Sequence, residues 1–310
     1  MPTVQQIPTL VSLAEESIAI RQLAPRTKTS YQDIIDTHIR PQWGNRLVTD
    51  ITFRELQAWL SEIATKHPAL AHRIHVVIRQ AIRLALIDDL VSKNIADYIR
   101  LPRPPKKDVV ALTPQEFQAA AAEITGTRDR LIIEIMAVGG LRFCEVAGLR
   151  TSSVTPTGLI VDRSITPRRG GGFNIGSVKN HQARKVQLPK GLLIRVRNYA
   201  DSQESKGSEL LFANTVGRPL DIGNWNSRVL RPACERAKIP TITAHILRHT
   251  SATTALHAGV PVHVVAKHLG HADGGVTFAH YAGTWNSKLT DLADIVGSEL
   301  LEFETSTTHK

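Results

Sequence analysis

A proline-rich stretch near residue 100 divides the 310-residue chain into two segments of different character. Residues 100–112 contain three prolines and four basic residues. Proline removes amide donors and stiffens the backbone, so we expect a linker at 103–112. The chain is long enough for two domains. We therefore expect one domain over residues 1–102 and a second over residues 113–286.

Residues 8–99 have the apolar spacing of helices. Thr52, followed by Glu55 three positions later, predicts a capping box, and a longer helix is expected over about 69–89. We expect 41–45 to break the helix that precedes it. Three arginines recur at roughly helical intervals along the long helix, where they form either an ordinary solvated face or a face laid against DNA phosphates. They are Arg73, Arg79 and Arg83.

The second segment mixes helices with a short run of strands. Thr113 followed by Pro114 is typical of a helix start. Three stretches of strand character, at 158–162, 173–178 and 184–188, predict a small three-stranded sheet, after which helices return. The fold class expected is therefore mainly α with a small antiparallel β-sheet. An acidic amphipathic helix is expected at about 287–303.

The charge of the chain favours a polyanionic partner. Its formal net charge is +10 and its sequence pI is about 9.9, although a basic protein without such a partner can have the same composition. Residues 163–190 contain no acidic residue. A solvated face usually mixes both signs, so this block predicts contact with a phosphate backbone. Its basic members are Arg163, Arg168, Arg169, Lys179, Arg184, Lys185 and Lys190.

Several site classes are not expected from the sequence. The two cysteines, Cys144 and Cys234, form no CxxC pair, which argues against a zinc site or a disulfide framework and fits a reducing cytoplasm. His245 and His249 have the spacing of a zinc pair, but isoleucine stands where an HExxH motif has glutamate. No phosphate-binding loop ends in GK[ST], so we expect neither a metal nor a nucleotide cofactor. We expect no signal peptide and no membrane span.

Histidine, arginine and tyrosine residues in the last third supply groups for phosphoryl transfer. The guanidinium fork matches a pair of phosphate oxygens, and residues three apart on a helix share one face. A phenol is a weak nucleophile at its ordinary pKa near 10, but it can attack when cations polarise its target. This combination predicts phosphoryl transfer without a metal. The residues in the last third are His245, Arg248, His271 and Tyr281, and Arg142 and Glu145 lie upstream of them.

The order and spacing of these groups resemble the tyrosine recombinase, or phage integrase, family. The matching runs are Gly140–Glu145, His245–Thr250, Leu269–His271 and Tyr281. In the front segment, His38–Gly44 and the residues around position 50 resemble the core-DNA-binding domain of phage-type members. The resemblance covers nearly the whole chain, and it implies a helical, SAM-like core-binding domain followed by an α+β catalytic domain.

The resemblance also implies a mechanism. Tyr281 would attack the scissile phosphodiester, form a 3′-phosphotyrosyl bond and release a 5′-hydroxyl. Arg142 and Arg248 would hold the non-bridging oxygens and stabilise the charge of the transition state. Because the phosphotyrosyl bond stores the energy of the broken linkage, strand exchange would need neither ATP nor a metal.

The remaining groups take supporting roles in the same resemblance. His271 would hydrogen-bond the phosphate, and His245 would assist proton transfer to or from the tyrosine. Lys179 best matches the lysine that protonates the leaving 5′-oxygen, and Lys185 is the alternative. Glu145 matches an acidic position that orients the arginine site.

The partners implied are double-stranded DNA and further copies of the chain. We expect a monomer in free solution, a homotetramer on core or attachment sites that acts through a Holliday junction, and residues 287–310 that dock on a neighbouring subunit. An accessory DNA-bending or directionality protein is a further expected partner. The expected location is the bacterial host cytoplasm, at the nucleoid. Since the core-binding domain begins near residue 8, we expect no arm-type DNA-binding domain.

Three other functions remain open from the sequence. A host recombinase that resolves chromosome dimers belongs to the same family. A catalytically silent DNA-binding protein could use the same scaffold, although the full set of chemical groups argues against it. A type IB topoisomerase would relax DNA as a monomer.

Overall fold

The computed structural model describes residues 7–105, 111–168, 170–178, 183–205, 207 and 209–270. The chain divides into two compact units, Met1–Lys107 and Asp108–Lys310. Each unit has a hydrophobic core of its own. Within the described residues, no helix is long and apolar enough to cross a membrane.

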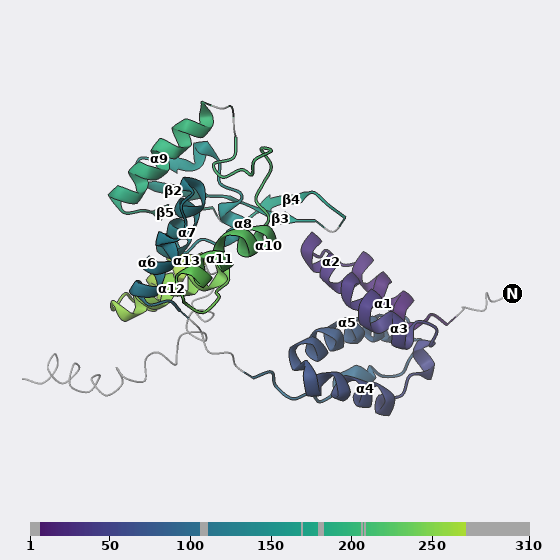
Figure 1. Ribbon diagram of the computed structural model, residues 1–310. Helices are drawn as coiled ribbons and strands as arrows, with labels where there is room; N and C mark the ends of the chain where they lie inside the picture. The colour runs from purple at the N-terminus through teal and green to yellow at the C-terminus, as the bar shows by residue number, and fades with distance from the viewer. Residues whose placement is uncertain are drawn as a thin grey trace, which may run out of the picture. The chain divides into compact units, whose positions relative to one another are not determined.

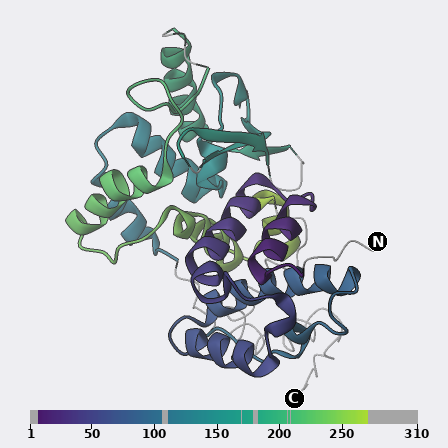
Figure 2. The same cartoon turned by 90° about the vertical axis from the view of Figure 1, so that its right-hand side faces the viewer.

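The first unit consists of helices and loops wherever the structure describes it (Figures 1 and 2). Helix α1 packs against α5, and α4 packs against α5 as well. Buried aliphatic side chains such as Leu10, Leu60 and Ile78 fill the space between them. The elements are α1 (Leu10–Ala19), α2 (Pro25–Ile34), η1 (Ile35–Ile39), α3 (Arg40–Trp43), η2 (Val48–Asp50), α4 (Phe53–Lys66), α5 (Pro68–Ile87) and η3 (Ile95–Tyr98).

Two local expectations for this unit are confirmed. The Thr52 hydroxyl accepts from the Glu55 amide at 3.3 Å, and the Glu55 carboxylate accepts from the Thr52 amide at 3.0 Å, which completes the capping box of α4. The long helix expected at about 69–89 is α5, over Pro68–Ile87.

The expected break at 41–45 is right about the end of the helix and wrong about Pro41. The helical run continues through Pro41 and ends at Trp43. The preceding segment η1 is a π-helix, in which the Arg40 amide bonds to the carbonyl of Ile35 five residues earlier. A proline ring clashes with the carbonyl four residues before it in an α-helix, and the wider π turn relieves that clash.

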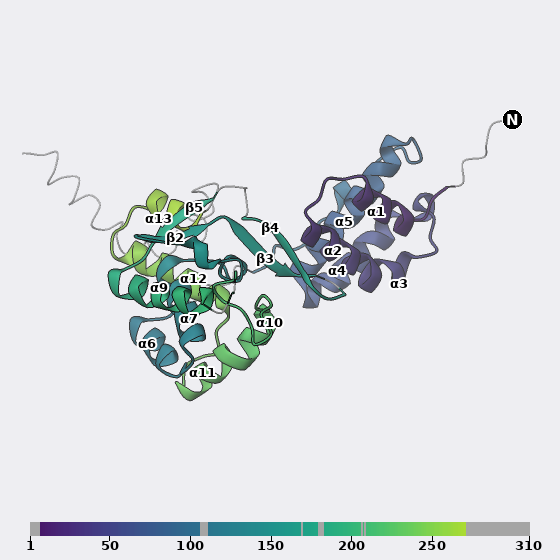
Figure 3. The same ribbon diagram turned by 90° about the horizontal axis from the view of Figure 1, so that it is seen from above.

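The second unit combines helices with two small antiparallel sheets (Figure 3). Its helical elements are α6 (Pro114–Ala122), α7 (Thr127–Gly139), α8 (Phe143–Val146), η4 (Thr151–Ser153), α9 (Lys190–Glu204), α10 (Ile222–Trp225), η5 (Asn226–Leu230), α11 (Arg231–Arg236), α12 (Ala244–His257) and α13 (Val262–Leu269). Its strands are β1 (Val154–Thr155), β2 (Gly158–Val161), β3 (Arg163–Pro167), β4 (Phe173–Ser177) and β5 (Arg184–Gln187). As expected, Thr113 caps α6 through a capping box with Glu116.

The expected sheet is wrong in one strand. The three-stranded sheet has the order β1-β2-β5, whereas Phe173–Ser177 pairs with β3 in a separate hairpin. Three glycines with positive φ, Gly170 to Gly172, turn the chain between β3 and β4, so β4 folds back on its sequence neighbour. Figures 1 and 3 show this hairpin projecting from the body of its unit.

Candidate active site

Two glycine turns at helix ends shape the centre of the site. Gly140 ends α7 with φ of 63°, and Gly270 ends α13 with φ of 68°. Both lie in the left-handed region, which favours glycine. A Cβ built on Gly140 would lie 2.5 Å from Leu269 Cδ2, so the two helix ends are in close contact.

Arg248 joins these two turns from α12. Its Nη1 donates to the Gly140 carbonyl at 2.6 Å and its Nη2 donates to the Leu269 carbonyl at 2.7 Å. The side chain is buried. The last carbonyls of a helix lack partners within the helix, and a cation at the C-terminus is favoured by the helix dipole. Arg248 therefore fixes the ends of α7 and α13 relative to each other.

Arg142 follows the first turn and is held by Glu145. Its Nη1 donates to Glu145 Oε1, and its backbone amide donates to Glu145 Oε2, each at 2.9 Å. The Arg142 side chain is 23% exposed, whereas that of Glu145 is 1% exposed. The guanidinium is thus anchored at one edge and still reaches the surface.

Glu145 remains charged in spite of its burial. Burial raises the pKa of the Glu145 carboxyl, but the hydrogen bonds and charges of Arg184 and Arg142 together lower the pKa below its ordinary value. Arg184 supplies the larger part of that stabilisation, through Nη1 to Oε1 at 3.0 Å and Nη2 to Oε2 at 2.7 Å. The carboxylate is therefore the acceptor at the centre of two guanidinium groups.

The histidines of α12 lie beside this cluster. His245 is exposed and His249 is half-buried, and their rings meet edge to face with centroids 4.4 Å apart. His245 lies one turn before the buried Arg248, as the expected spacing requires. The structure bonds Arg142 to Glu145, and it brings Arg248 of α12 to the Gly140 carbonyl two residues before Arg142, with His245 one turn earlier on α12. Lys179, His271 and Tyr281 lie outside the described residues.

His268, which has no role in the mechanism that the resemblance implies, lies at the same centre, where its carbonyl accepts from Arg184. Burial lowers the pKa of His268, the hydrogen bond to the backbone of Val138 opposes that shift, and the charges of Arg184 and Arg248 add to it. The imidazole is therefore held neutral at neutral pH. The apolar face of α13, which contains the buried Val265 and Leu269, was a signal that His268 lies partly buried at the end of this helix.

The register of β5 separates two basic residues expected to contact DNA. Arg184 pairs with Val161 and shares the inner face with Val186, whereas Lys185 pairs with the exposed Ile160 on the outer face. Side chains alternate between the faces of a strand, so Lys185 points away from the Glu145 side of the sheet.

The remaining basic residues of the predicted DNA-binding set differ in their partners. Arg163 donates to the Gly148 carbonyl at 2.6 Å and pairs with Glu209 at 3.0 Å. Arg168, in the β3–β4 turn, is exposed, and Arg169 lies outside the described residues.

The three arginines of α5 are all exposed. Arg79 pairs with Asp97 at 2.5 Å, and Arg73 donates to the hydroxyl of Ser30. Arg83 makes no ion pair with any residue in the part of the chain that the structure describes.

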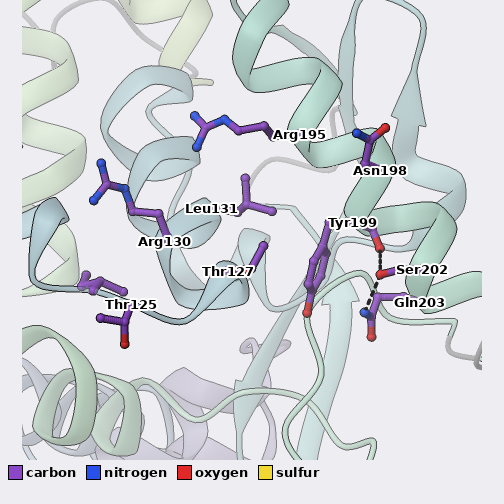
Figure 4. Close-up of a pocket in the computed structure, with 10 residues that line it drawn as sticks. Thr125, Thr127, Arg130, Leu131, Arg195, Asn198, Tyr199, Ser202 and Gln203 are labelled. Carbon is purple, nitrogen blue, oxygen red and sulfur yellow. Dashed lines mark hydrogen bonds between the residues drawn. The ribbon is translucent and has the colours of Figure 1, made fainter.

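A cavity of about 620 Å³ lies between α7 and α9, and none of the predicted site residues lines it (Figure 4). Arg130 and Arg195 line one side of it, and Tyr199 and Gln203 line the other. Burial raises the pKa of the Tyr199 phenol, which also stacks on Phe212.

Side chains of the types that bind metal ions do not form a cluster within the described residues. No group of three or more histidine, cysteine, aspartate or glutamate side chains in them could hold a metal ion.

Two family models match the chain. The phage integrase central domain matches residues 11–101, and the phage integrase family matches residues 111–286. The integrase of Mycobacterium phage L5 is 27% identical over 270 residues, which cover 85% of this chain and 72% of that protein. The tyrosine recombinase XerC of Alcanivorax borkumensis is 26% identical over 291 residues, covering 89% and 88%.

Solved structures share the fold. The Tn1549 transposon integrase in complex with transposon right end DNA has a TM-score of 0.79 at 19% identity, over 92% of this chain and 100% of that chain. A lambda integrase tetramer bound to a Holliday junction has a TM-score of 0.68 at 20% identity, over 88% and 78%. These matches confirm the mainly helical fold with small antiparallel sheets. The two family matches span most of the residues, and the chain belongs to the phage integrase family of tyrosine-type site-specific recombinases.

Proposed function

We propose that this recombinase integrates and excises phage DNA at core-type attachment sites by transesterification through Tyr281. The observation that carries the proposal is that Arg142 and Arg248, remote in sequence, are both held at the turn between α7 and α8, Arg142 by Glu145 and Arg248 by the Gly140 carbonyl. Arg142, together with the second N–H of each Arg248 Nη nitrogen, would hold the non-bridging oxygens of one phosphate. Tyr281 would attack the phosphorus, and the 3′-phosphotyrosyl bond would replace the bond to the 5′-oxygen.

Proton transfers would complete the reaction. His245, exposed on α12 one turn before Arg248, would take the proton of the tyrosine hydroxyl. His271, the next residue after the glycine that ends α13, would hydrogen-bond the phosphate. Lys179 would protonate the leaving 5′-oxygen. The outer-face position of Lys185 supports Lys179 over its alternative.

The two units would divide the work of binding and chemistry. We assign residues 1–102 to core-type DNA binding, 103–112 to the linker, 113–286 to catalysis and 287–310 to subunit exchange. The division into two compact units and the separate family matches support this assignment. Exposed cations would contact the phosphate backbone, with Arg83, Arg168 and Lys185 the best placed of those described.

The assembly on DNA would be a tetramer. The similar lambda integrase forms a tetramer on a Holliday junction, which supports the same arrangement here. Analytical ultracentrifugation with a synthetic four-way junction should give four protomers per junction. A single protomer that relaxes supercoiled DNA would instead indicate a topoisomerase.

Covalent capture tests the chemistry directly. A core site would first be selected from a random duplex pool by retention on the wild-type protein, and a nicked suicide substrate would be built on it. Wild type should become covalently attached to the 3′-phosphate, and Tyr281→Phe should bind the same DNA without attachment. Attachment that persists in Tyr281→Phe, or none with wild type, contradicts the proposed mechanism.

Resolution of chromosome dimers by the host is the second candidate. The similarity to the XerC recombinase over most of both chains favours it. The selected core site separates the two candidates. A site that maps to the replication terminus of a bacterial chromosome indicates dimer resolution, whereas one shared by a phage and its host indicates integration.

A further inference from the structure

All three guanidinium nitrogens of Arg184 donate hydrogen bonds within the protein. Its Nη1 and Nη2 donate to the two oxygens of Glu145, and its Nε donates to the carbonyl of His268 at 3.3 Å. The side chain is only 13% exposed. A guanidinium whose fork is filled by a carboxylate cannot offer that fork to a DNA phosphate. Arg184 therefore differs from the exposed cations around it in the sequence.

The carboxylate that Arg184 holds is the one that orients Arg142. Glu145 accepts from both the guanidinium and the backbone amide of Arg142. The position of the Arg142 guanidinium therefore depends on the Glu145 carboxylate, whose side chain is only 1% exposed. Arg184 approaches the same two oxygens from strand β5, and so limits the rotation of that carboxylate.

The third bond of Arg184 reaches the end of α13. His268 and Leu269 present the last carbonyls of that helix, which are bonded by Arg184 and Arg248 respectively. A Cβ on Gly270 would lie 3.0 Å from the Arg184 side chain, so the turn and the arginine are in contact. His271 follows this turn directly in the sequence.

We propose that Arg184 is a positioning residue of the recombination reaction. It acts through Glu145 on Arg142, and through the His268 carbonyl on the turn that leads to His271. This role rests on the proposed function of those two catalytic residues. A displacement of about 1 Å at a reacting group can cost about 100-fold in rate, so an indirect role is large enough to measure.

Single-turnover cleavage of the suicide substrate tests the role. Arg184→Gln should lower the rate of covalent attachment by about 10-fold to 100-fold, because Arg142 loses its fixed carboxylate. Its affinity for the uncleaved core site should stay within about threefold, and the slope of log affinity against log salt should not change. A weaker affinity with a slope reduced by about one unit would show a phosphate contact instead and overturn the proposal.

The route through Glu145 is tested by a double-mutant cycle. If Arg184 acts through that carboxylate, the double variant Arg184→Gln/Glu145→Gln should lose far less rate than the product of the two single losses. Arg184→Lys should recover part of the rate, since it keeps the charge and loses the fork. Losses that multiply fully would overturn the route.

Arg195→Gln is the matched control. Arg195 also pairs with a glutamate of the second unit, Glu134, at 2.7 Å, but on the α9 side of the cavity. Its rate and affinity should stay within about twofold of wild type, as for an exposed ion pair. An equal loss of rate in both variants would show a general effect on folding rather than positioning.

A measurement without DNA separates this inference from the proposed function. Carboxyl ¹³C NMR of the full chain should show that Arg184→Gln raises the pKa of Glu145, because its strongest partner is lost. If wild type forms no covalent complex, the proposed function falls while this titration still decides whether Arg184 controls Glu145. An unchanged titration overturns the inference even if Arg184→Gln slows cleavage.

Discussion

Two carboxylates in the second unit are each held by two arginines, yet they do different work. Glu145 is bonded by Arg142 and Arg184 and is 1% exposed. Glu134, on α7, is paired with Arg130 at 2.8 Å and with Arg195 at 2.7 Å and is 11% exposed. The exposure of the arginines differs more than that of the carboxylates, since the side chain of Arg184 is 13% exposed and that of Arg195 is 51% exposed.

The difference lies in what else each arginine holds. Arg184 also bonds the end of α13, and the backbone amide of Arg142 bonds the same carboxylate. The Glu145 cluster therefore connects α8, β5 and α13. The Glu134 group connects α7 with α9 and, through the Arg130 bond to the Ala121 carbonyl, with α6, beside the cavity of Figure 4. Exposed ion pairs contribute little to stability, while breaking a buried pair leaves uncompensated charge. The same residue types thus form a buried centre in one place and, in the other, a buried carboxylate held by two partly exposed arginines.

Removal of each carboxylate should give the largest contrast. Glu145→Ala leaves Arg142 and Arg184 without their acceptor, so the free energy of unfolding should fall by about 3–5 kcal/mol. Glu134→Ala should cost about 1 kcal/mol, since its arginines turn to water. Urea denaturation of both variants measures the contrast. Equal losses would show that the burial of the first cluster carries no extra stability.

Acid should remove part of the Glu145 contribution. The folded pKa of this group lies below its ordinary value of 4.5. Its contribution is therefore present above pH of about 4.5 and is lost as the pH falls through the folded pKa. The unfolding free energy of wild type relative to Glu145→Gln should be constant from neutral pH down to that value and should shrink below it. A difference that grows in acid would contradict this sign.

The close contact of the two helix ends gives a smaller effect. Gly140→Ala places a Cβ at positive φ and 2.5 Å from Leu269 Cδ2, so the free energy of unfolding should fall by about 2 kcal/mol. Gly191→Ala in α9 is the control, because no atom lies within 4 Å of its Cβ and its φ is not positive. Chemical denaturation should show a loss for the first variant and a neutral or small stabilising effect for the second.

Local features of the fold were predictable from the sequence, and the tertiary ones were not. The capping boxes at Thr52 and Thr113 and the glycine turn at Gly270 depend on residues within one helical turn. Strand character alone does not say whether Phe173–Ser177 pairs with β3 or joins the sheet of β2 and β5, and the structure pairs it with β3. The π-helical segments before Pro41 and Pro232 likewise depend on where a helix absorbs a proline.

The candidate site divides in the same way. The spacing His245–Arg248 and the pair Arg142–Glu145 follow from helical geometry. The bond from Arg184 to Glu145 joins residues 39 positions apart, so no local rule predicts it. The alternation Arg184, Val186, Leu188 was the available signal, since it places an arginine on an apolar face, where it requires a buried acceptor.

Helix caps provide the smallest contrast, between two threonines whose hydroxyls cap a helix and one threonine without a capping bond. Thr52→Ala and Thr113→Ala should each lower the free energy of unfolding by about 1 kcal/mol, because each hydroxyl satisfies an amide of the first helical turn. Thr243→Ala should cost much less, since Thr243 precedes α12 without a side-chain capping bond and Ile246 stands where the other two helices have glutamate. Thermal denaturation of the three variants checks this order. A loss at Thr243 as large as at Thr113 would mean that the cap geometry of α12 differs in solution, and with it the presentation of His245 and Arg248 one turn later.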